Sequence, residues 1–362
     1  MRRPPNRGNE LLTGSVLQHQ VGRRMTCTHA TIFIVVLILL LDLTALLAPH
    51  GAEGQSTGKV PRIGIIAETA PPPAPNRGLA AFRQSLRELG YVEGQNVLLD
   101  VRWSEGVSGR HPALVSELVR IPVDVIVVSI TGAALAAKRA TSTIPIVSTG
   151  AGALVEGGAV ANLARPGGNV TGLTALAPEL SAKRLELLKE AVPNLSRVAV
   201  LMSPYRTAPS LGDGLLKATE AAAQVVGIHL QVLRIEEPAD LEGAFKAARR
   251  GGAGAVIVLP NPFFGVHAAR VAELALKYRL PVIGSTLGAV EAGFLLAYGA
   301  NAPDLWRRAA TYVDKVLKGA KPADLPIEQP MKFDLFINLK TAKGLGLTIP
   351  PAVLLRADQV IE

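Results

Sequence analysis

Two stretches of this sequence share one pattern, and together they decide the fold. The first pairs residues 124–129 (DVIVVS) with residues 144–149 (IPIVST) across a helix-length segment. The second pairs residues 255–260 (AVIVLP) with residues 280–286 (LPVIGST) across a segment of similar kind. Each copy is an apolar strand, a helix and a second apolar strand ending in small or hydroxyl residues. The repeat predicts two similar α/β lobes, and a cleft between lobes is a common place for a small ligand.

Strands and helices alternate along the chain on both sides of this repeat. Further strands are predicted at residues 62–67, 97–103, 170–174, 198–202, 228–234 and 294–298. Strict alternation predicts parallel sheets with right-handed crossovers, in which ligands bind at the carboxyl ends of the strands. The fold class is therefore α/β, with two Rossmann-like parallel-sheet lobes around a hinged cleft.

The end of the chain does not begin a third domain. A helix at 303–317, a Pro-rich stretch at 321–330 and a strand–helix unit at 332–345 must cover the existing lobes. A helix is also expected at 266–278.

A tail that crosses back between the lobes predicts several hinge segments, which we place near Thr174, Tyr298 and Gln329. Closure of the lobes on a ligand would bend the chain at such segments. The predicted parts are an export signal and linker at 1–58, an N-terminal lobe at 59–174 plus 301–329, and a C-terminal lobe at 175–300 plus 330–362.

The N-terminal residues are organised like an export signal. Two arginines at 23–24 precede an apolar run at 30–48, and small residues follow. This layout predicts export to the periplasm, with a mature chain that starts between roughly Pro49 and Gln55. The run is nearly long enough to span a bilayer, so a permanent membrane anchor at residues 30–48 is the alternative.

The charge of the chain gives no sign of a nucleic-acid partner. The formal net charge is +9, but the basic residues alternate with acids, as in residues 183–190 (KRLELLKE). A nucleic-acid binder usually carries a basic stripe interleaved with aromatic residues, and this sequence has none. We therefore expect no nucleic-acid partner.

Catalytic and metal-binding patterns are also missing from the sequence. His111, His229 and His267 are scattered without a metal-ligand spacing, and His111 and His267 are expected to cap helices or lie at the surface. The chain has no Gly-x-Ser-x-Gly motif, and its only cysteine, Cys27, lies before the predicted mature start. The sequence predicts neither an enzyme nor a metal site.

The loop after the first strand excludes a nucleotide cofactor. Residues 68–75 (ETAPPPAP) fill it with prolines, which lack the N–H groups that cradle phosphate. Gly150 and Gly152 form a looser cluster after a later strand, where we expect them to allow close packing or backbone contact with a ligand. No cofactor is predicted.

Polar side chains follow several of the predicted strands in both halves. Any one of them could simply cap the next helix. Loops of this kind from both halves nevertheless face one cleft in such a fold, and hydroxyls are good partners for a polar ligand. We therefore predict that the ligand is bound by Glu68, Ser129, Thr131, Ser148, Thr149, Ser203, Tyr205, Asn261 and Ser285.

Longer motifs carry a family resemblance. They are residues 82–96 (FRQSLRELGYVEGQN), 161–172 (ANLARPGGNVTG), 183–190 (KRLELLKE), 309–322 (AATYVDKVLKGAKP) and 338–350 (NLKTAKGLGLTIP). In combination they resemble the ABC-transporter substrate-binding proteins of the tryptophan/tyrosine-transport type, over essentially all of residues 60–362.

This resemblance implies a type I periplasmic binding fold, with two lobes joined by three crossovers. It also implies a small organic ligand, such as an amino acid or an aromatic acid, and delivery by a monomer to an ABC permease in the inner membrane. At the implied cleft the chain departs from its relatives: residues 152–155 read GALV where GDPV is common, and residues 202–204 read MSP where WNP is common.

Three other interpretations fit parts of the sequence. A membrane-anchored ligand sensor of the same fold would keep residues 30–48 as its anchor. The effector domain of a transcription regulator shares the architecture but would need an N-terminal helix-turn-helix in place of the export-like segment. A Rossmann-type enzyme is opposed by the proline-filled loop at residues 68–75.

Overall fold

The computed structural model describes residues 59–68, 76–152, 154–175, 180–204 and 209–362. Residues 60–362 form one compact unit. The export signal predicted at 1–58 lies outside the described residues, as does the apolar run at 30–48. Within the described ranges, no helix combines the length and the apolar character needed to span a membrane.

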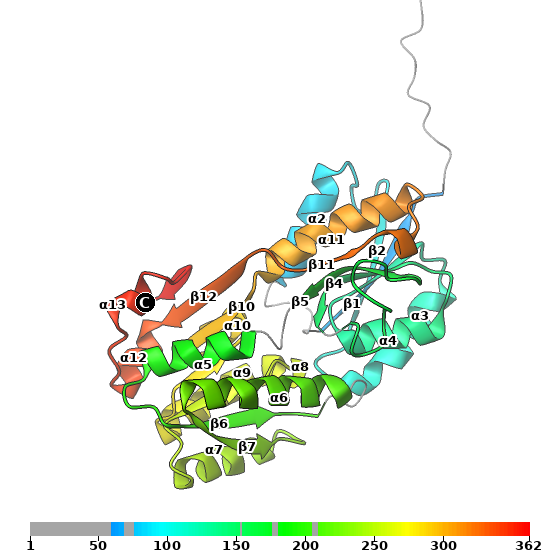
Figure 1. The fold of residues 1–362 in the computed structure, drawn as a ribbon. Coiled ribbons are helices and arrows are strands. Elements are labelled where there is room, and N and C mark those ends of the chain that lie inside the picture. The colour runs from blue at the N-terminus through cyan, green and yellow to red at the C-terminus, as the bar shows by residue number, and fades with distance from the viewer. Residues whose placement is uncertain (1–58, 69–75, 153, 176–179, 205–208) are drawn as a thin grey trace, which may run out of the picture. The chain divides into compact units, whose positions relative to one another are not determined.

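The first sheet has six parallel strands in the order β11-β5-β4-β3-β1-β2 (Figure 1). Its strands are β1 (Arg62–Ala67), β2 (Leu98–Trp103), β3 (Val125–Val128), β4 (Ile146–Gly152), β5 (Val170–Ala175) and β11 (Ile327–Glu328). Every residue of the central strand β3 is buried, as expected for a parallel sheet with helices on both faces.

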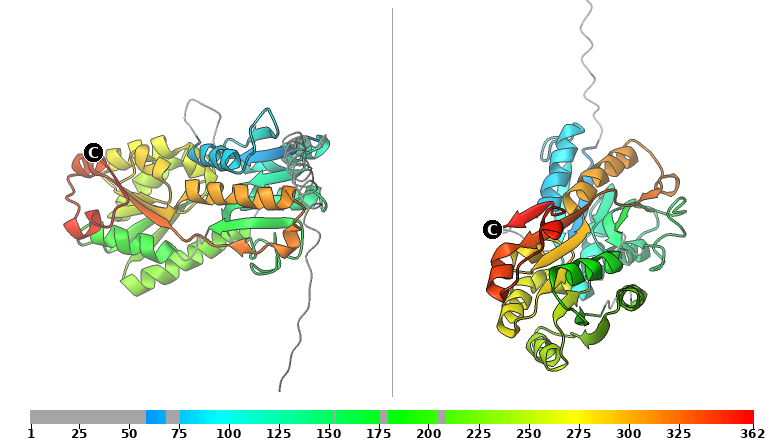
Figure 2. Two further views of the ribbon diagram at one scale, coloured as in Figure 1. Left: turned by 90° about the horizontal axis from the view of Figure 1, so that it is seen from above. Right: turned by 60° about the vertical axis from the view of Figure 1, so that its left-hand side comes forward.

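Helices cover both faces of this sheet (Figures 1 and 2). They are α2 (Arg77–Glu88), α3 (His111–Arg120), α4 (Thr131–Ala140) and α11 (Ala302–Leu317), with the short 3₁₀ turns η1 (Ser108–Arg110) and η2 (Pro322–Asp324). Alternate residues along the strands face opposite helix pairs. Val127 packs in the cluster of α2 and α11, whereas Ile126 and Val128 pack in the cluster of α3 and α4. Phe82 and Trp306 join α2 to α11 edge to face, with ring centroids 6.0 Å apart.

The second sheet has seven strands in the order β13-β12-β10-β9-β8-β6-β7. Its strands are β6 (Arg197–Met202), β7 (His229–Arg234), β8 (Ala255–Val258), β9 (Val282–Gly284), β10 (Leu296–Ala300), β12 (Phe333–Asn338) and β13 (Gln359–Ile361). Its helices are α5 (Leu180–Ala191), α6 (Pro209–Val226), α7 (Asp240–Arg250), α8 (Pro262–Val266), α9 (Ala268–Tyr278), α10 (Leu287–Glu291), α12 (Leu339–Leu345) and α13 (Pro351–Leu354). The α/β fold of two lobes predicted from the sequence is confirmed.

The prediction that both sheets are entirely parallel is wrong for one strand of the second sheet. β12 pairs antiparallel with β10, while the other pairs in this sheet are parallel. The chain leaves the second sheet at the end of β10, forms α11 and β11 in the first lobe, and returns into β12. Because β12 starts where β10 stops, the two neighbours must run in opposite directions.

We propose that the boundaries of the lobes lie where the chain passes from one sheet to the other. β5 ends the first run of strands in the first sheet at Ala175, and α11 and β11 return to that sheet at residues 302–328. β12 at residue 333 then joins the second sheet. We propose that the three connections between these segments are the hinges of the protein.

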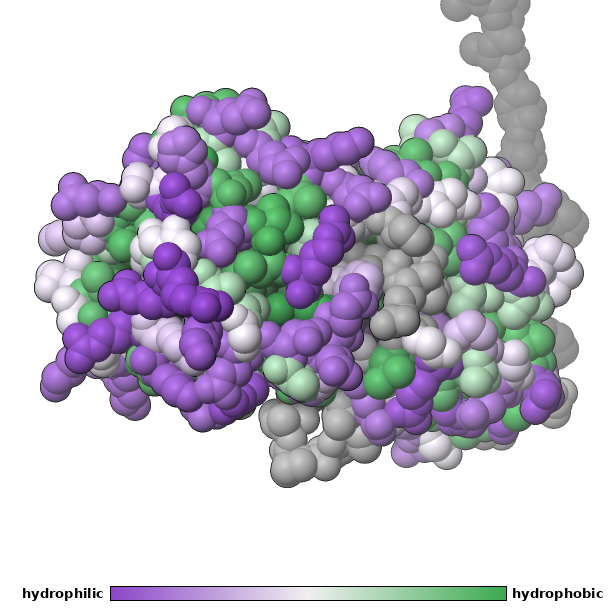
Figure 3. Space-filling model, turned by 90° about the horizontal axis from the view of Figure 1, so that it is seen from below, coloured by the Kyte–Doolittle hydropathy of each residue, from purple (hydrophilic) through white to green (hydrophobic). Residues whose placement is uncertain are grey.

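Charged residues are dispersed over the surface. Ion pairs join Arg83 to Glu93 at 2.8 Å and Arg102 to Glu117 at 2.8 Å. On the face drawn in Figure 3, hydrophilic residues spread over both lobes with hydrophobic residues between them. A basic chain whose arginines pair locally with acids presents no single cationic field.

Candidate functional site

The carboxyl ends of the two sheets face one another, because two contacts join the lobes on that side. Gly106 follows β2, and a Cβ atom added to it would lie 2.6 Å from Cγ2 of Val266 in α8, the helix that follows β8. Arg77 at the start of α2 pairs with Glu291 at the end of α10, with Nη2 and Oε1 2.6 Å apart. Residues that follow the strands of both lobes therefore border a common region.

Glu68 directly follows β1 and is half-buried at the end of the strand. Its Oε1 atom is fully buried and accepts no hydrogen bond from any residue in the described part of the chain. Burial raises the pKa of Glu68 to about 8, because the carboxylate loses its hydration. Its backbone carbonyl accepts the N–H of Gly106 at 2.9 Å, which ties Glu68 to the loop that contacts α8.

Ser104 and His111 belong to the same corner of the first lobe, and the prediction from the sequence did not include them. Ser104 follows β2 and is fully buried, and its hydroxyl has no partner among the described residues. Nδ1 of His111, the first residue of α3, is likewise buried without such a partner. The expectation of a capping or surface role for His111 is wrong, because its side chain is 1% exposed. Burial lowers the pKa of His111 to about 4, so the ring is neutral at physiological pH.

The side chains of two predicted ligand residues of the first lobe form hydrogen bonds with the backbone of the protein itself. The hydroxyl of Ser148 donates to the carbonyl of Leu173 at 2.7 Å and accepts the N–H of Ala151 at 3.0 Å. The hydroxyl of Thr131 donates to the carbonyl of Gly152. These bonds hold the irregular end of β4, where its register with β5 shifts after Thr149.

The side chains of Ser129 and Thr149 remain available. Thr149 is 2% exposed, and its hydroxyl has no partner among the described residues. Ser129 is half-buried, and no hydrogen bond joins its hydroxyl to the described part of the chain. Gly150 lets β4 approach α11 closely, since a Cβ there would lie 2.8 Å from Leu305, in agreement with the packing role predicted for this glycine.

In the second lobe, Asn261 shapes the helix α8. Its side chain donates to the carbonyl of Ser203 at 3.0 Å and accepts the N–H of Phe263 at 2.9 Å, which caps α8. The hydroxyls of Ser203 and Ser285 form no hydrogen bond with residues that the structure describes. Tyr205 lies outside the described residues.

α8 brings aromatic rings to this region, and the sequence prediction missed it. The helix predicted at 266–278 is confirmed as α9 to within two residues, whereas α8 is a separate short helix before it, and the two are divided at His267. The ring of the half-buried Phe263 lies 4.6 Å from that of His267 and 5.2 Å from that of Phe264, measured between centroids. The signal was the Asn-Pro pair at 261–262, shortly after β8, because Asn caps helices and Pro favours their first turn.

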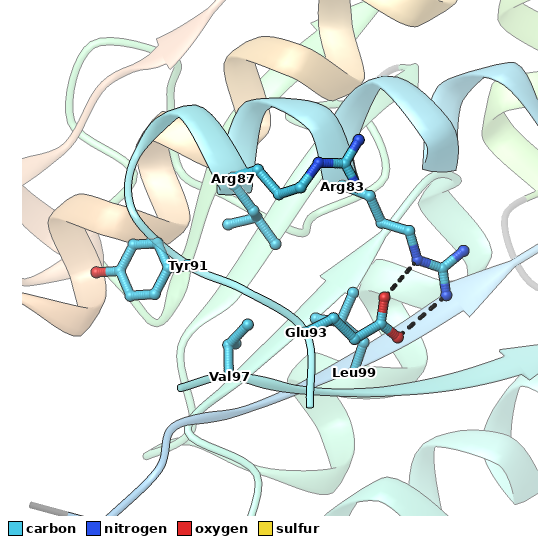
Figure 4. Close-up of a pocket in the computed structure, with 7 residues that line it drawn as sticks. Arg83, Arg87, Tyr91, Glu93, Val97 and Leu99 are labelled. Carbon is cyan, nitrogen blue, oxygen red and sulfur yellow. Dashed lines mark hydrogen bonds and ion pairs between the residues drawn. The ribbon is translucent and has the colours of Figure 1, made fainter. Parts of the chain in front are cut away.

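A separate hollow lies at the amino end of β2 (Figure 4). It is lined by Arg83, Leu86, Arg87, Tyr91, Glu93, Val97 and Leu99. Its volume of about 20 Å³ has room for one water molecule and not for an organic ligand. Arg83 closes one side by pairing with Glu93 at 2.8 Å. This hollow is a packing feature and no ligand site.

We expect Ser148→Ala to destabilise the protein by about 1–3 kcal/mol, because the substitution leaves buried backbone groups such as the Ala151 N–H without a partner. Urea unfolding of the two proteins measures the change. Ser129→Ala is the matched control, since that hydroxyl forms no hydrogen bond with the described residues, and its unfolding free energy should match the wild type. Equal effects of both substitutions would contradict a structural role for Ser148.

Two facing sheets with polar and aromatic groups at their strand ends define a two-lobe ligand-binding protein. The model of the ABC transporter substrate binding protein family matches residues 71–361, and the chain belongs to this family. The family resemblance found in the sequence is thus confirmed. Members of the family are binding proteins, and this protein is not an enzyme. Among the described residues, no group of three or more His, Asp or Glu side chains could hold a metal ion.

Relatives of known ligand or structure agree with this assignment. A tyrosine-binding protein of Clostridioides difficile (strain R20291) is 26% identical over 291 residues, which cover 78% of this chain and 80% of the relative. The crystal structure of an ABC domain from Streptococcus pneumonia in complex with L-Trp has a TM-score of 0.76 and 26% identity, and the match covers 84% of this chain and 100% of that one. A conserved domain protein from Vibrio cholerae has a TM-score of 0.75 and 29% identity over 83% of this chain and 100% of its own.

Proposed function

We propose that this protein is the solute-binding component of an ABC importer and that it captures an aromatic amino acid between its lobes. The observation that carries this proposal is the combination at the facing strand ends. Glu68 and the hydroxyls of Ser104 and Thr149, which have buried oxygens without a partner among the described residues, lie on one sheet edge, and the aromatic helix α8 lies on the other. The tyrosine-binding and L-Trp-bound relatives support the same ligand class.

The ring of such a ligand suits Phe263. A half-buried phenylalanine beside a second ring offers an apolar face on which an indole or phenol can stack, and such pairs are worth about 0.5–1.5 kcal/mol beyond the area they bury. The polar half of the ligand then faces the first lobe. The acid lies in the first lobe and the aromatic helix in the second, so the ligand should favour the closed arrangement of the lobes.

Ligand screening by thermal shift tests this proposal. L-tryptophan, L-tyrosine and L-phenylalanine should raise the melting temperature by mass action, whereas L-leucine and L-glutamate at the same concentration should not. A shift with aliphatic or acidic amino acids and none with the aromatic ones would contradict the proposed ligand class.

The partner that we propose is an ABC permease of the inner membrane, to which a monomer of this protein delivers its ligand. The site of action is the periplasm, reached through the export signal predicted at residues 1–58. Family membership supports both, since a substrate-binding protein serves a transporter.

We expect the exported protein to start between roughly Pro49 and Gln55, because the apolar run before this region is flanked like a cleaved signal. Mass spectrometry of the N-terminus of native material measures the start. Recovery from the membrane fraction of a chain that retains residues 30–48 would favour the membrane-anchored sensor instead.

A further inference from the structure

We propose that Glu68 binds the positively charged amino group of the ligand and thereby selects ligands that carry an ammonium group. The inference rests on the proposed function, because it assigns one part of the amino acid to one residue of the first lobe.

The first observation is that Oε1 of Glu68 is buried without a partner among the described residues. Buried acids are normally paired with a cation or with several hydrogen-bond donors, because an isolated buried carboxylate is costly. Oε1 of Glu68 has neither among the described residues. An amino-group ligand would supply the missing charge and donor together.

Two arginines that follow the strands at this corner already pair with other acids. Arg77, which begins the next helix after Glu68, binds Glu291 at 2.6 Å. Arg110, in the turn that leads to α3, binds Glu105 at 2.6 Å. Neither of these two arginines therefore pairs with Glu68, and the ammonium group of a bound ligand could take that place.

Neighbouring acceptors fit the three N–H donors of an ammonium group. β1 lies between β2 and β3, and the register places Ser104 after β2 and Ser129 after β3, one on each side of Glu68. Neither hydroxyl has a partner in the described part of the chain. One carboxylate flanked by two hydroxyls offers acceptors to a primary ammonium group, while it repels a carboxylate.

Two ligands that differ only in the amino group test the proposal. L-tryptophan and indole-3-propionate share the ring and the carboxylate, and only the first carries the ammonium group. Calorimetric titration should show that Glu68→Gln, which keeps the size of the side chain, weakens L-tryptophan binding on the order of 100-fold, as expected for the loss of one partner of a buried charge pair. Binding of indole-3-propionate should be unchanged or tighter.

Glu93→Gln is the matched control, because Glu93 lies at the opposite edge of the lobe and pairs with Arg83. It should bind both compounds like the wild type. Equal losses for both compounds in Glu68→Gln, or no loss for L-tryptophan, would overturn the role of Glu68. If the wild type binds none of the aromatic amino acids, the proposed function itself fails.

Binding measurements on the wild type test the proposal even if Glu68→Gln does not fold. The wild type should prefer L-tryptophan over both indole-3-propionate and N-acetyl-L-tryptophan, which lack a charged amino group, by on the order of 100-fold. Similar affinities for the three compounds would overturn the proposal without any variant.

Discussion

Replacing Gly106 with valine should weaken ligand binding by about 100-fold or more while each lobe stays folded. A Cβ atom at this position would lie 2.6 Å from Cγ2 of Val266 and 3.3 Å from the carbonyl oxygen of Pro262, both in the opposite lobe. The added side chain therefore holds the lobes apart. If the closed state falls to about 1% of its population, the apparent affinity falls by the same factor. Calorimetric titration with L-tryptophan measures the loss.

A second glycine separates this steric effect from backbone strain. Gly106 has a φ of 72°, a conformation that valine adopts only with strain. Gly94 has a φ of 82°, and an added Cβ there meets no atom within 4 Å. Gly94→Val should therefore cost stability without loss of affinity. A smaller variant, Gly106→Ala, should also weaken binding, and adding Val266→Ala to it should restore part of the affinity. Equal losses of affinity in Gly106→Val and Gly94→Val would contradict closure through this contact.

Affinity for an amino acid should rise by up to about tenfold per pH unit between pH 6 and 8. Burial raises the pKa of Glu68 to about 8, so most of the free protein carries a protonated Glu68 in this range. Binding of an ammonium group requires the carboxylate, and the proton must leave. One proton released per ligand gives this slope, which flattens above pH 8. Titrations in buffers of different ionisation enthalpy measure the proton directly.

The unliganded protein should show the opposite trend in stability. A folded-state pKa above the ordinary value of 4.5 means that the native state binds more protons than the unfolded chain between pH 4.5 and 8. This contribution to the unfolding free energy is present below pH 4.5 and is lost as the pH rises through 8. His111 acts at lower pH, since its lowered pKa adds stability as the pH rises from about 4 to 6.5. Glu68→Gln should remove the trend between pH 6.5 and 8, and its persistence would contradict the assignment to Glu68.

The strands of the fold were predictable because their signal is local. β1 begins and ends where the apolar run does, at Arg62 and Ala67, and α11 starts one residue from the predicted helix. The direction of β12 was not predictable in this way. It depends on a return of the chain from the other lobe, which no periodicity of residues 332–345 records.

The site was predictable as an edge of the sheets but not residue by residue. A hydroxyl after a strand can serve the fold or a ligand, and the difference lies in partners distant in sequence. Ser148 finds the carbonyl of Leu173, 25 residues away, and Thr131 finds that of Gly152, 21 residues away. Thr149, next to Ser148, finds none among the described residues. The burial of His111 also depends on tertiary packing and gives no sequence signal.

The central claim is that an aromatic amino acid draws the two lobes together. Small-angle X-ray scattering of the exported protein, titrated with L-tryptophan, tests it most directly. The radius of gyration should fall and level off at one ligand per chain. The ligand favours the closed state, in which contacts between the lobes, such as Arg77 with Glu291, are formed. Tight binding of L-tryptophan by calorimetry with an unchanged scattering curve would contradict the account.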